Sequence, residues 1–370
     1  MKKIRLRDVV SFSKGQQING DELMKKGRYD YLNGGINPSG CWNDFNVTGD
    51  TVTVSEGGNS CGYVNYMSYP FWCGAHCYYL YDSKLNNKYL YYALKSQQEK
   101  IMKLRTGACM PNIKKTDLGK FELYITTDIN AQELTVFILD KITDLIDKRK
   151  KQLEKFDELV KARFVEMFGT LNANEKGFDV IDIEKLCTLI KDGTHQTPTY
   201  TEDKQNGFKF LSSKDVMTQK ICWEDIKYIP AELHEKLYAT IQPKRNDILM
   251  SKNGVNYGVA AVNDTDEVFD IYVSLALLRP KTDRVNPVYL RCAINNPDTK
   301  RQFDSSIKGI GVPNLHLGEI KKTKVLLPPI SKQNEFTDFV EQTDKSKLAV
   351  QKGLQELEIL KKSLMQQYFG

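Results

Sequence analysis

Residues 153–159 read Leu153-Glu154-Lys155-Phe156-Asp157-Glu158-Leu159, and a similar stretch, Leu354-Gln355-Glu356-Leu357-Glu358-Ile359-Leu360, follows about 201 residues later. The first stretch leads to Met167-Phe168-Gly169 and the second to Tyr368-Phe369-Gly370. This period is far longer than the roughly 20–50 residues of solenoid repeats. The chain therefore contains two domain-sized units, each large enough for its own core and each ending in the same kind of segment.

Two further pairs of segments match upstream of these ends. Gly107-Ala108-Cys109-Met110-Pro111-Asn112-Ile113 matches Gly309-Ile310-Gly311-Val312-Pro313-Asn314-Leu315, and residues 55–62 match residues 251–258. The offset between matching segments stays between about 196 and 202 residues, so the insertions are small. Such a duplication predicts a pseudo-twofold arrangement of two similar domains, and duplex DNA with two half-sites is a common target of two-fold proteins.

Composition and charge narrow the class of protein. The hydrophobic share of 41% is ordinary for a globular protein, and no apolar run approaches the roughly 18 residues of a membrane span. The N-terminus does not resemble a signal peptide, and the eight cysteines do not match across the repeat, so we expect a cytoplasmic protein without a disulfide framework. The net charge of +6 is too small for a protein that merely coats phosphate. We therefore expect both that the protein reads bases with few phosphate contacts and that a partner supplies further positive charge.

The predicted fold class is α+β, with two similar mixed α/β globular domains in pseudo-twofold arrangement, separated by two long antiparallel helices that resemble a coiled coil. We predict a first recognition domain over 1–128, a central spacer helix over 129–169, a second recognition domain over 170–329 and a C-terminal spacer helix over 330–370. β-Branched and aromatic residues predict strands at 52–54, 77–81 and 247–250, and helical segments are expected at 89–104 and from 288.

Both spacer segments show the apolar spacing of long helices. In the first, apolar residues recur mostly at intervals of three and four, at 138, 142, 145, 153, 156, 160, 164 and 167. Asn130, with Glu133 three residues later, resembles a capping box, and Ser331 follows two prolines as the expected cap of the second helix. Heptad-like spacing over more than three heptads predicts that the helices pair, and each would span roughly 55 Å, which suits a ruler between two globular domains.

The local motifs resemble a known family. Residues 190–198 read Ile190-Lys191-Asp192-Gly193-Thr194-His195-Gln196-Thr197-Pro198, residues 210–216 follow with a strand and a turn, and a Gly-x-x-x-Pro-Asn-Ile/Leu motif ends each globular domain before Asp117 or Glu319. This combination resembles the specificity subunit of type I restriction–modification systems over essentially the whole chain. The first domain departs from the pattern, since residues 13–18 stand where the Asp-Gly-Thr-His loop is expected, which fits two domains that read different sequences.

The resemblance implies a DNA-binding subunit without catalysis of its own. Each domain would read one half of a split target in double-stranded DNA, and the paired helices would dock two methyltransferase (modification) subunits. The chain would hold no metal or cofactor, because S-adenosylmethionine would lie on the methyltransferase subunits and ATP with magnesium on the motor (restriction) subunits. No methyltransferase loop and no Walker phosphate loop are visible in the sequence, which agrees with a reader.

Polar side chains in the loops are the candidates for contact with DNA. Asn and Gln bind adenine, Lys and Arg bind guanine, and Ser and Thr bind either. The same residues also shape turns and caps, so the set is a firmer prediction than any one member. The candidates are Lys14, Gln16, Asn33, Asn37, Asn59, Arg105 and Asn112 in the first domain, and His195, Lys214, Ser251, Lys252, Asn253, Asn256, Lys308 and Asn314 in the second.

Other interpretations of the sequence stay open. The basic stretch from Lys95 to Lys120 is either a phosphate track or a solvated helix face. Residues 73–77, Cys73-Gly74-Ala75-His76-Cys77, suggest a zinc site with Cys61 or, more simply, buried free cysteines. Asp298, Glu319 and Lys321 have the loose spacing of a metal-dependent nuclease. Besides the DNA reader and the nuclease, a third possible function is a coiled-coil adaptor that binds only proteins.

Overall fold

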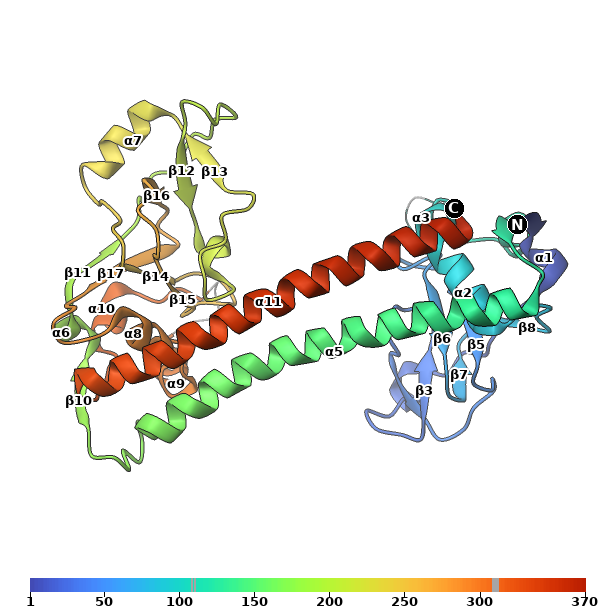
Figure 1. Ribbon diagram of the computed structural model, residues 1–370, viewed down its shortest axis with the longest axis horizontal. Helices are drawn as coiled ribbons and strands as arrows, with labels where there is room; N and C mark the ends of the chain where they lie inside the picture. Colours follow the sequence, from blue (N-terminus) through green and yellow to red (C-terminus); the bar gives the residue numbers. More distant parts are fainter. Residues whose placement is uncertain (108, 110, 308–312) are drawn as a thin grey trace. The chain divides into compact units, whose positions relative to one another are not determined.

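The computed structural model describes residues 1–107, 109, 111–307 and 313–370, and the chain divides into two compact units (Figure 1). The first unit contains Met1–Gln152 together with Val350–Gly370, and the second contains Leu153–Ala349. Each unit therefore holds one globular domain and a segment of each of the two long helices. Within the described residues, no helix is both long enough and apolar enough to cross a membrane.

The first unit contains three small sheets. A four-stranded antiparallel sheet has the order β2-β8-β5-β6, a three-stranded sheet has the order β4-β3-β7 with β3 and β7 parallel, and β1 pairs with β9. The strands are β1 Lys2–Arg5, β2 Ser11–Lys14, β3 Tyr29–Leu32, β4 Gly40–Trp42, β5 Thr51–Ser55, β6 Val64–Met67, β7 Phe71–Cys73, β8 Cys77–Tyr81 and β9 Glu122–Ile125. The helices are α1 Leu6–Val9, the 3₁₀ helix η1 Gly20–Glu22, α2 Asn87–Ser96, α3 Gln98–Met102 and α4 Lys115–Lys120.

The second unit repeats this topology strand for strand. Its sheets have the orders β11-β17-β14-β15, β13-β12-β16 and β10-β18, and β12 is again parallel to β16. The strands are β10 Asp179–Asp182, β11 Cys187–Asp192, β12 Phe208–Leu211, β13 Lys227–Ile229, β14 Ile248–Ser251, β15 Ala260–Val262, β16 Phe269–Ile271, β17 Leu275–Pro280 and β18 Lys324–Leu327. The helices are α6 Ile183–Leu186, η2 Ser213–Val216, α7 Ala231–Tyr238, α8 Pro287–Ile294, α9 Pro297–Ser306 and α10 Leu317–Lys322. The sequence repeat is thus a repeat of two mixed domains with one fold, as predicted.

The two long helices are α5 Ile129–Phe168 and α11 Ile330–Phe369, close to the predicted segments. Both predicted caps were wrong by two residues. The Asp128 carboxylate accepts the N–H of Asn130 at 3.0 Å, because the helix already begins at Ile129. The second helix begins directly after Pro329, whose carbonyl accepts the N–H of Lys332 at 2.9 Å, so Ser331 lies inside the first turn.

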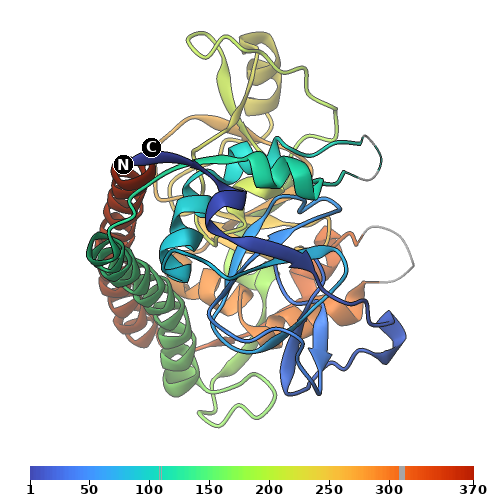
Figure 2. The same cartoon turned by 90° about the vertical axis from the view of Figure 1, so that its right-hand side faces the viewer.

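In each unit, segments of α5 and α11 run antiparallel and side by side (Figures 1 and 2). In the first unit Lys150 lies 3.2 Å from Glu358. In the second, Asp157 pairs with Lys347 at 2.5 Å, and Arg163, six residues further along α5, pairs with Glu335 at 3.3 Å. The residue numbers rise on one helix while they fall on the other, which confirms the predicted antiparallel pairing.

The ends of the long helices complete the domain cores. Phe369 is 2% exposed in the core of the first unit and packs on Tyr89, with ring centroids 5.1 Å apart. Phe168 is fully buried in the core of the second unit and packs on Tyr289 at 4.9 Å. Each globular domain is therefore closed by the helix that follows the other domain in sequence.

This packing makes a testable prediction about stability. Phe369→Ala should lower the free energy of unfolding of the first unit by about 3–5 kcal/mol, the usual cost of removing a buried phenylalanine ring. Chemical denaturation with probes in each unit measures the effect. Phe137→Ala is the matched control, because Phe137 is 59% exposed on α5 and should change stability little. Equal, small effects of both variants would contradict closure of the core by α11.

Candidate nucleic-acid interface

A glycine turn follows the first strand of the large sheet in each domain. A Cβ atom on Gly15 would lie 1.9 Å from the carbonyl oxygen of Cys73, and a Cβ atom on Gly193 would lie 2.3 Å from that of Ile271. No side chain fits at either position, because backbone atoms cannot yield as a flexible side chain does. Both domains therefore bring the loop after this strand against the three-stranded sheet in the same way.

A second loop, after β5 in one domain and β14 in the other, also has one conformation in both. Gly62 donates its N–H to the carbonyl of Ser55, and Gly258 donates to that of Ser251, each at 2.8 Å. Both glycines have left-handed backbone angles, with φ of +87° and +86°. The loops at 55–62 and 251–258 are therefore equivalent pieces of backbone that carry different side chains.

The residue after the Pro-Asn pair of each repeat forms a backbone hydrogen bond with this loop. Ile113 donates its N–H to the carbonyl of Glu56, and Leu315 donates to that of Lys252, both at 2.9 Å. Ile113 and Leu315 are fully buried. The repeated motif before α4 and α10 thus fixes the position of the loop, which brings three separate segments together at one place in each domain.

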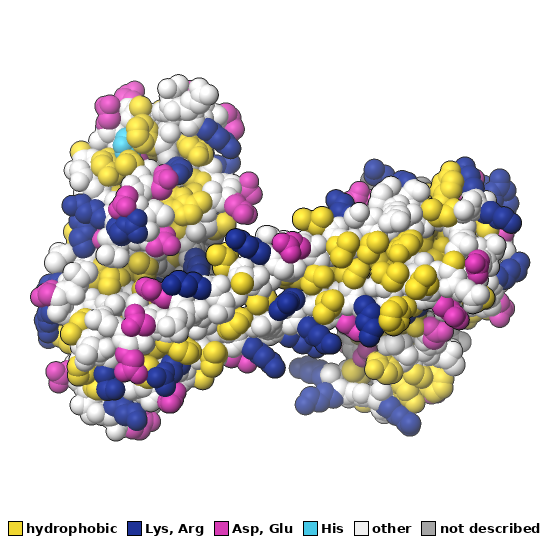
Figure 3. Space-filling view, viewed as in Figure 1, with side chains coloured by type: hydrophobic (Ala, Val, Ile, Leu, Met, Phe, Trp, Pro, Cys, Tyr) yellow, Lys and Arg dark blue, Asp and Glu magenta, His cyan; other side chains and the backbone are white. Residues whose placement is uncertain are grey.

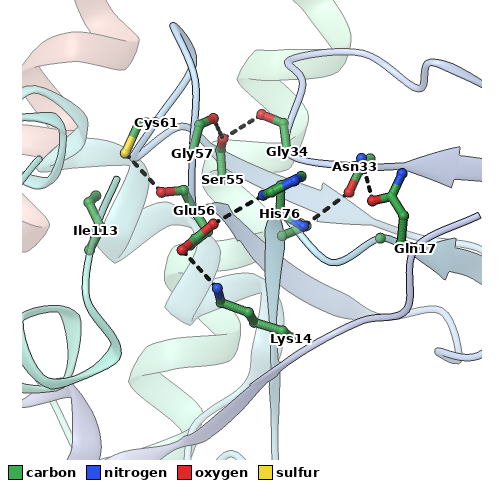
Figure 4. A network of polar contacts seen from close by, with 12 residues as sticks. Lys14, Gln17, Asn33, Gly34, Ser55, Glu56, Gly57, Cys61, His76 and Ile113 are labelled. Atoms are coloured by element: carbon green, nitrogen blue, oxygen red, sulfur yellow. Dashed lines mark hydrogen bonds and ion pairs between the residues drawn. The ribbon is translucent and has the colours of Figure 1, made fainter. Parts of the chain in front are cut away.

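In the first domain these segments carry a polar network centred on Glu56 (Figure 4). The carboxylate of Glu56 lies 2.7 Å from the ammonium of Lys14 and 3.4 Å from Nδ1 of His76. The side-chain oxygen of Asn33 accepts the N–H of His76 at 3.0 Å, and its amide donates to Gln17 at 3.1 Å. The network links the strand β2, the loop after β3, the loop after β5 and the turn before β8.

The second domain has a corresponding network centred on Asp192. Its carboxylate forms an ion pair with Lys252, whose side chain is only 5% exposed. The same carboxylate lies 3.6 Å from Nε2 of His195, whose side chain is 75% exposed. A lysine and a histidine therefore flank one carboxylate in both domains.

The acidic and the basic residue of this ion pair occupy exchanged positions in the two domains. Lys14 pairs across the sheet with Tyr78, and Asp192 pairs in the same register with Ala276. Glu56 and Lys252 are equivalent as well, because their N–H groups donate to His76 and to Ser274 respectively. The ion pair is thus retained with reversed polarity.

Comparison with known proteins identifies the family. A family model for the type I restriction modification DNA specificity domain matches the chain twice, over residues 1–155 and 175–359. The chain belongs to this family. Both matches cover a globular domain and extend into the long helix that follows it, so the duplicated unit is one domain plus one helix.

Members of this family match the chain over different lengths. A putative type I specificity subunit of Mycoplasma genitalium is 34% identical over 164 residues, which cover 42% of this chain and 43% of the relative, less than half its length. The MjaVIII specificity subunit of Methanocaldococcus jannaschii is 21% identical over 294 residues, or 76% of this chain and 69% of the relative. The crystal structure of an S subunit from M. genitalium superposes with a TM-score of 0.66 at 22% identity, covering 100% of this chain and 96% of that one, which shows a common fold.

The structure places most of the first-domain candidates around the Glu56 network. Lys14 and Asn33 belong to it, and Asn59 is exposed on the same loop. Asn112 is exposed and bridges to Gly57 through its backbone. The remaining candidates are also exposed: Gln16 next to the glycine turn, Arg105 after α3 and Asn37 in the loop after β3.

The second-domain candidates divide into exposed and buried side chains. His195, Asn256 and Asn314 are exposed near the Asp192 network, and Asn253 bridges to Asn314. Lys214 is exposed on η2, where its ammonium reaches the carbonyl of Asp225 at 3.1 Å. Lys308 lies outside the described residues.

Two second-domain candidates have buried side chains, although they were expected to be exposed in a loop. Ser251 is fully buried and donates its hydroxyl to the carbonyl of Asn256 at 2.8 Å, so this hydroxyl is used to hold the loop. Lys252 is buried in its ion pair with Asp192. Both side chains are engaged inside the domain because they stand at the start of a tight loop that folds over the sheet.

Sequence reasoning missed Glu56 and Asp192 and treated His76 only as a zinc candidate. The signal was present in the aligned repeats, since Glu56 stands opposite Lys252 and Lys14 opposite Asp192. When two oppositely charged residues are exchanged between the two copies of a repeat, the exchange indicates that their side chains are in contact. Gln17 was missed for another reason, because only the folded loop brings it to Asn33.

The alternative metal sites receive no support from the described residues. Within 1–107, 109, 111–307 and 313–370, no three His, Cys, Asp or Glu side chains lie close enough together to hold a metal ion. Cys73 is buried, and its hydrogen bond with Cys77 together with burial raises the pKa of its thiol. Of the proposed nuclease residues, Asp298 accepts the N–H of Leu171 at 2.7 Å and Lys321 pairs with Glu184 at 3.2 Å, which are structural contacts.

The basic stretch from Lys95 to Lys120 is only partly available as a phosphate track. Burial lowers the pKa of Lys95 to about 8, and its ammonium donates to the carbonyl of Val64 at 2.9 Å. The other basic residues of this stretch are exposed: Lys100, Lys103, Arg105, Lys114, Lys115 and Lys120.

The glycine turns lead to a prediction. Gly15→Ala and Gly193→Ala should each lower the melting temperature and displace the adjoining loop, because the new methyl group would overlap a carbonyl oxygen. Thermal unfolding measures the effect. Gly20→Ala and Gly318→Ala are matched controls, since a Cβ atom at either position meets no atom within 4 Å. If all four variants melted alike, the turns would not be set by close approach.

Proposed function

We propose that this chain is the DNA-reading subunit of a type I restriction–modification complex, with each domain reading one half of a bipartite target. The observation that carries the proposal is the duplicated site: two domains present the same loops on the same backbone, with different polar side chains. A common scaffold places both loop sets against DNA in the same manner. Different side chains let the two half-sites differ in sequence.

The long helices support the role of a spacer. Each has 40 residues, which corresponds to about 60 Å of helix at 1.5 Å per residue. Cross-helix ion pairs in both units hold the two helices in one antiparallel register. In the proposed complex, this pair sets the number of base pairs between the half-sites.

The surfaces of the helices support docking of protein partners. In the first unit hydrophobic side chains gather along the long helices (Figure 3), and large exposed ones are Ile129, Leu134, Phe137, Leu145, Ile359 and Leu360. Exposed apolar side chains grouped on one surface favour covering by another protein. The partners that suit a DNA reader are two methyltransferase subunits, with motor subunits joining the full complex. Methyl transfer, ATP hydrolysis and cleavage would belong to those partners and their cofactors, and this chain would be non-catalytic.

The first test of the proposal is DNA binding by the assembled complex. The chain, co-purified with its methyltransferase partner, should bind one class of duplex selectively, and binding should weaken steeply as salt rises, because phosphate contacts release counterions. Electrophoretic mobility shifts at several salt concentrations measure this. Plasmid incubated with the purified chain and magnesium should stay intact, whereas cleavage would favour the nuclease alternative. Absence of DNA binding by the complex would favour a protein-only adaptor.

The second test concerns the spacer. Joint deletion of Lys148–Glu154 and Val350–Glu356 removes one heptad from each helix while keeping their pairing, and shortens the pair by about 10 Å. The preferred target should lose about three base pairs of spacer, at 3.4 Å per base pair, and keep both half-site sequences. Methylation mapping of host DNA measures both quantities. Altered half-sites with an unchanged spacer would contradict the role of the helices as a ruler.

A further inference from the structure

One histidine in each domain is exposed and lies beside a carboxylate. His76 has a side chain 61% exposed, while Glu56, which contacts its Nδ1, is 11% exposed. His195 has a side chain 75% exposed, while Asp192, which lies beside its Nε2, is 20% exposed. The carboxylate is thus the more buried member of each pair and the imidazole the more exposed one. In the first domain Glu56 lies between Lys14 and His76 (Figure 4).

A lysine neutralises the carboxylate in both domains. Lys14 approaches Glu56 at 2.7 Å from one side while His76 approaches from another. In the second domain Lys252 is buried against Asp192. An ion-paired carboxylate repels a polyanion less than a free one does, so the histidine beside it remains accessible to DNA.

The two histidines do not occupy equivalent positions. His76 lies in the turn before β8, where the second domain has Ser274, and both residues accept a backbone N–H through their carbonyls. His195 lies three residues after Asp192, in the loop that follows β11. Both domains therefore contain a lysine, a carboxylate and an exposed histidine close together, but each of the three stands at a different position in the two domains.

The carboxylate influences which imidazole nitrogen donates and which accepts a hydrogen bond. Nδ1 of His76 lies within hydrogen-bond distance of Glu56, and because a carboxylate only accepts hydrogen bonds, this ring nitrogen carries the hydrogen. This contact orients the His76 ring and leaves Nε2 as the nitrogen that does not face Glu56. Nε2 of His195 lies 3.6 Å from Asp192, which is beyond hydrogen-bond distance, so the carboxylate lies beside this ring without a hydrogen bond to it. A neutral ring accepts from the exocyclic amine of adenine or cytosine, and a protonated ring donates to N7 or O6 of guanine. Either contact is directional and depends on the base.

We propose that His76 and His195 are specificity-determining residues, each of which contacts one base edge in the half-site of its own domain, and that Glu56 is the positioning residue of His76. The inference rests on the proposed DNA-reading function. A fixed ring orientation favours a base over a phosphate, because exposed lysines and arginines already supply undirected charge in both domains. The exchange of positions places the two histidines differently on one scaffold, which suits two half-sites of different sequence.

The experiment uses the full chain in complex with its methyltransferase partner and a pool of duplex DNA with randomised sequence. Selected DNA is sequenced to give a motif with two half-sites. His76→Ala should reduce the preference at one base pair of the first half-site by about ten-fold or more and leave the second unchanged, as expected for loss of one base contact. His195→Ala should do the converse, so each variant controls for the other.

A second variant separates positioning from folding. Lys14→Asp combined with Glu56→Lys reproduces the polarity of the second domain and keeps an ion pair, but removes the carboxylate from His76. We expect a melting temperature close to that of the unmodified chain and the same loss of base preference as in His76→Ala. Retained preference in this double variant would overturn the positioning role of Glu56.

Two results would overturn the base contact. Unchanged motifs in both histidine variants would show that neither residue reads a base. A uniform loss of affinity for all sequences, with a reduced salt dependence, would indicate a phosphate contact instead. Failure of the unmodified complex to select any DNA would refute the proposed function itself, and this outcome is distinct from either of the other two.

Discussion

The structure depends on the burial of aromatic rings at the ends of two long helices. Phe369 enters the core of the first unit against Tyr89, and Phe168 enters the core of the second against Tyr289. Full burial of one such side chain stabilises a core by about 1.5–3 kcal/mol. The polar and charged residues along the helix surfaces contribute less, because exposed ion pairs are worth about 0–1 kcal/mol each. The helix ends therefore decide where each long helix is attached.

This attachment has a consequence for function. Each domain is closed by a helix that begins at the other domain, so neither core is complete with only its own contiguous sequence. Each globular domain with its loops consequently includes a distant part of the chain. In a reader of split targets, such a connection would tie the position of each loop set to the helical pair.

The loops combine a rigid backbone with variable side chains. Gly15 and Gly193 exclude side chains at one point, and the hydrogen bonds of Ile113 and Leu315 hold the second loop at another. Around these fixed points, Lys14 and Glu56 are replaced by Asp192 and Lys252 without loss of the ion pair. A scaffold that tolerates such an exchange is suited to changes of specificity, because the backbone does not depend on which partner carries which charge.

The sequence alone predicted the duplication from its repeated segments, and the α+β class and the two long helices from the spacing of its apolar residues. It also located most of the polar loops, although not the helix caps at Asp128 and Pro329. Other properties appear only in the folded chain: Ser251 and Lys252 point inward, Lys95 is partly buried, and Glu56 and Asp192 are the centres of two networks. The physical reason is that these properties arise from contacts between segments far apart in the sequence, such as Lys14 with Glu56 and Asp192 with Lys252, and no local periodicity records such contacts.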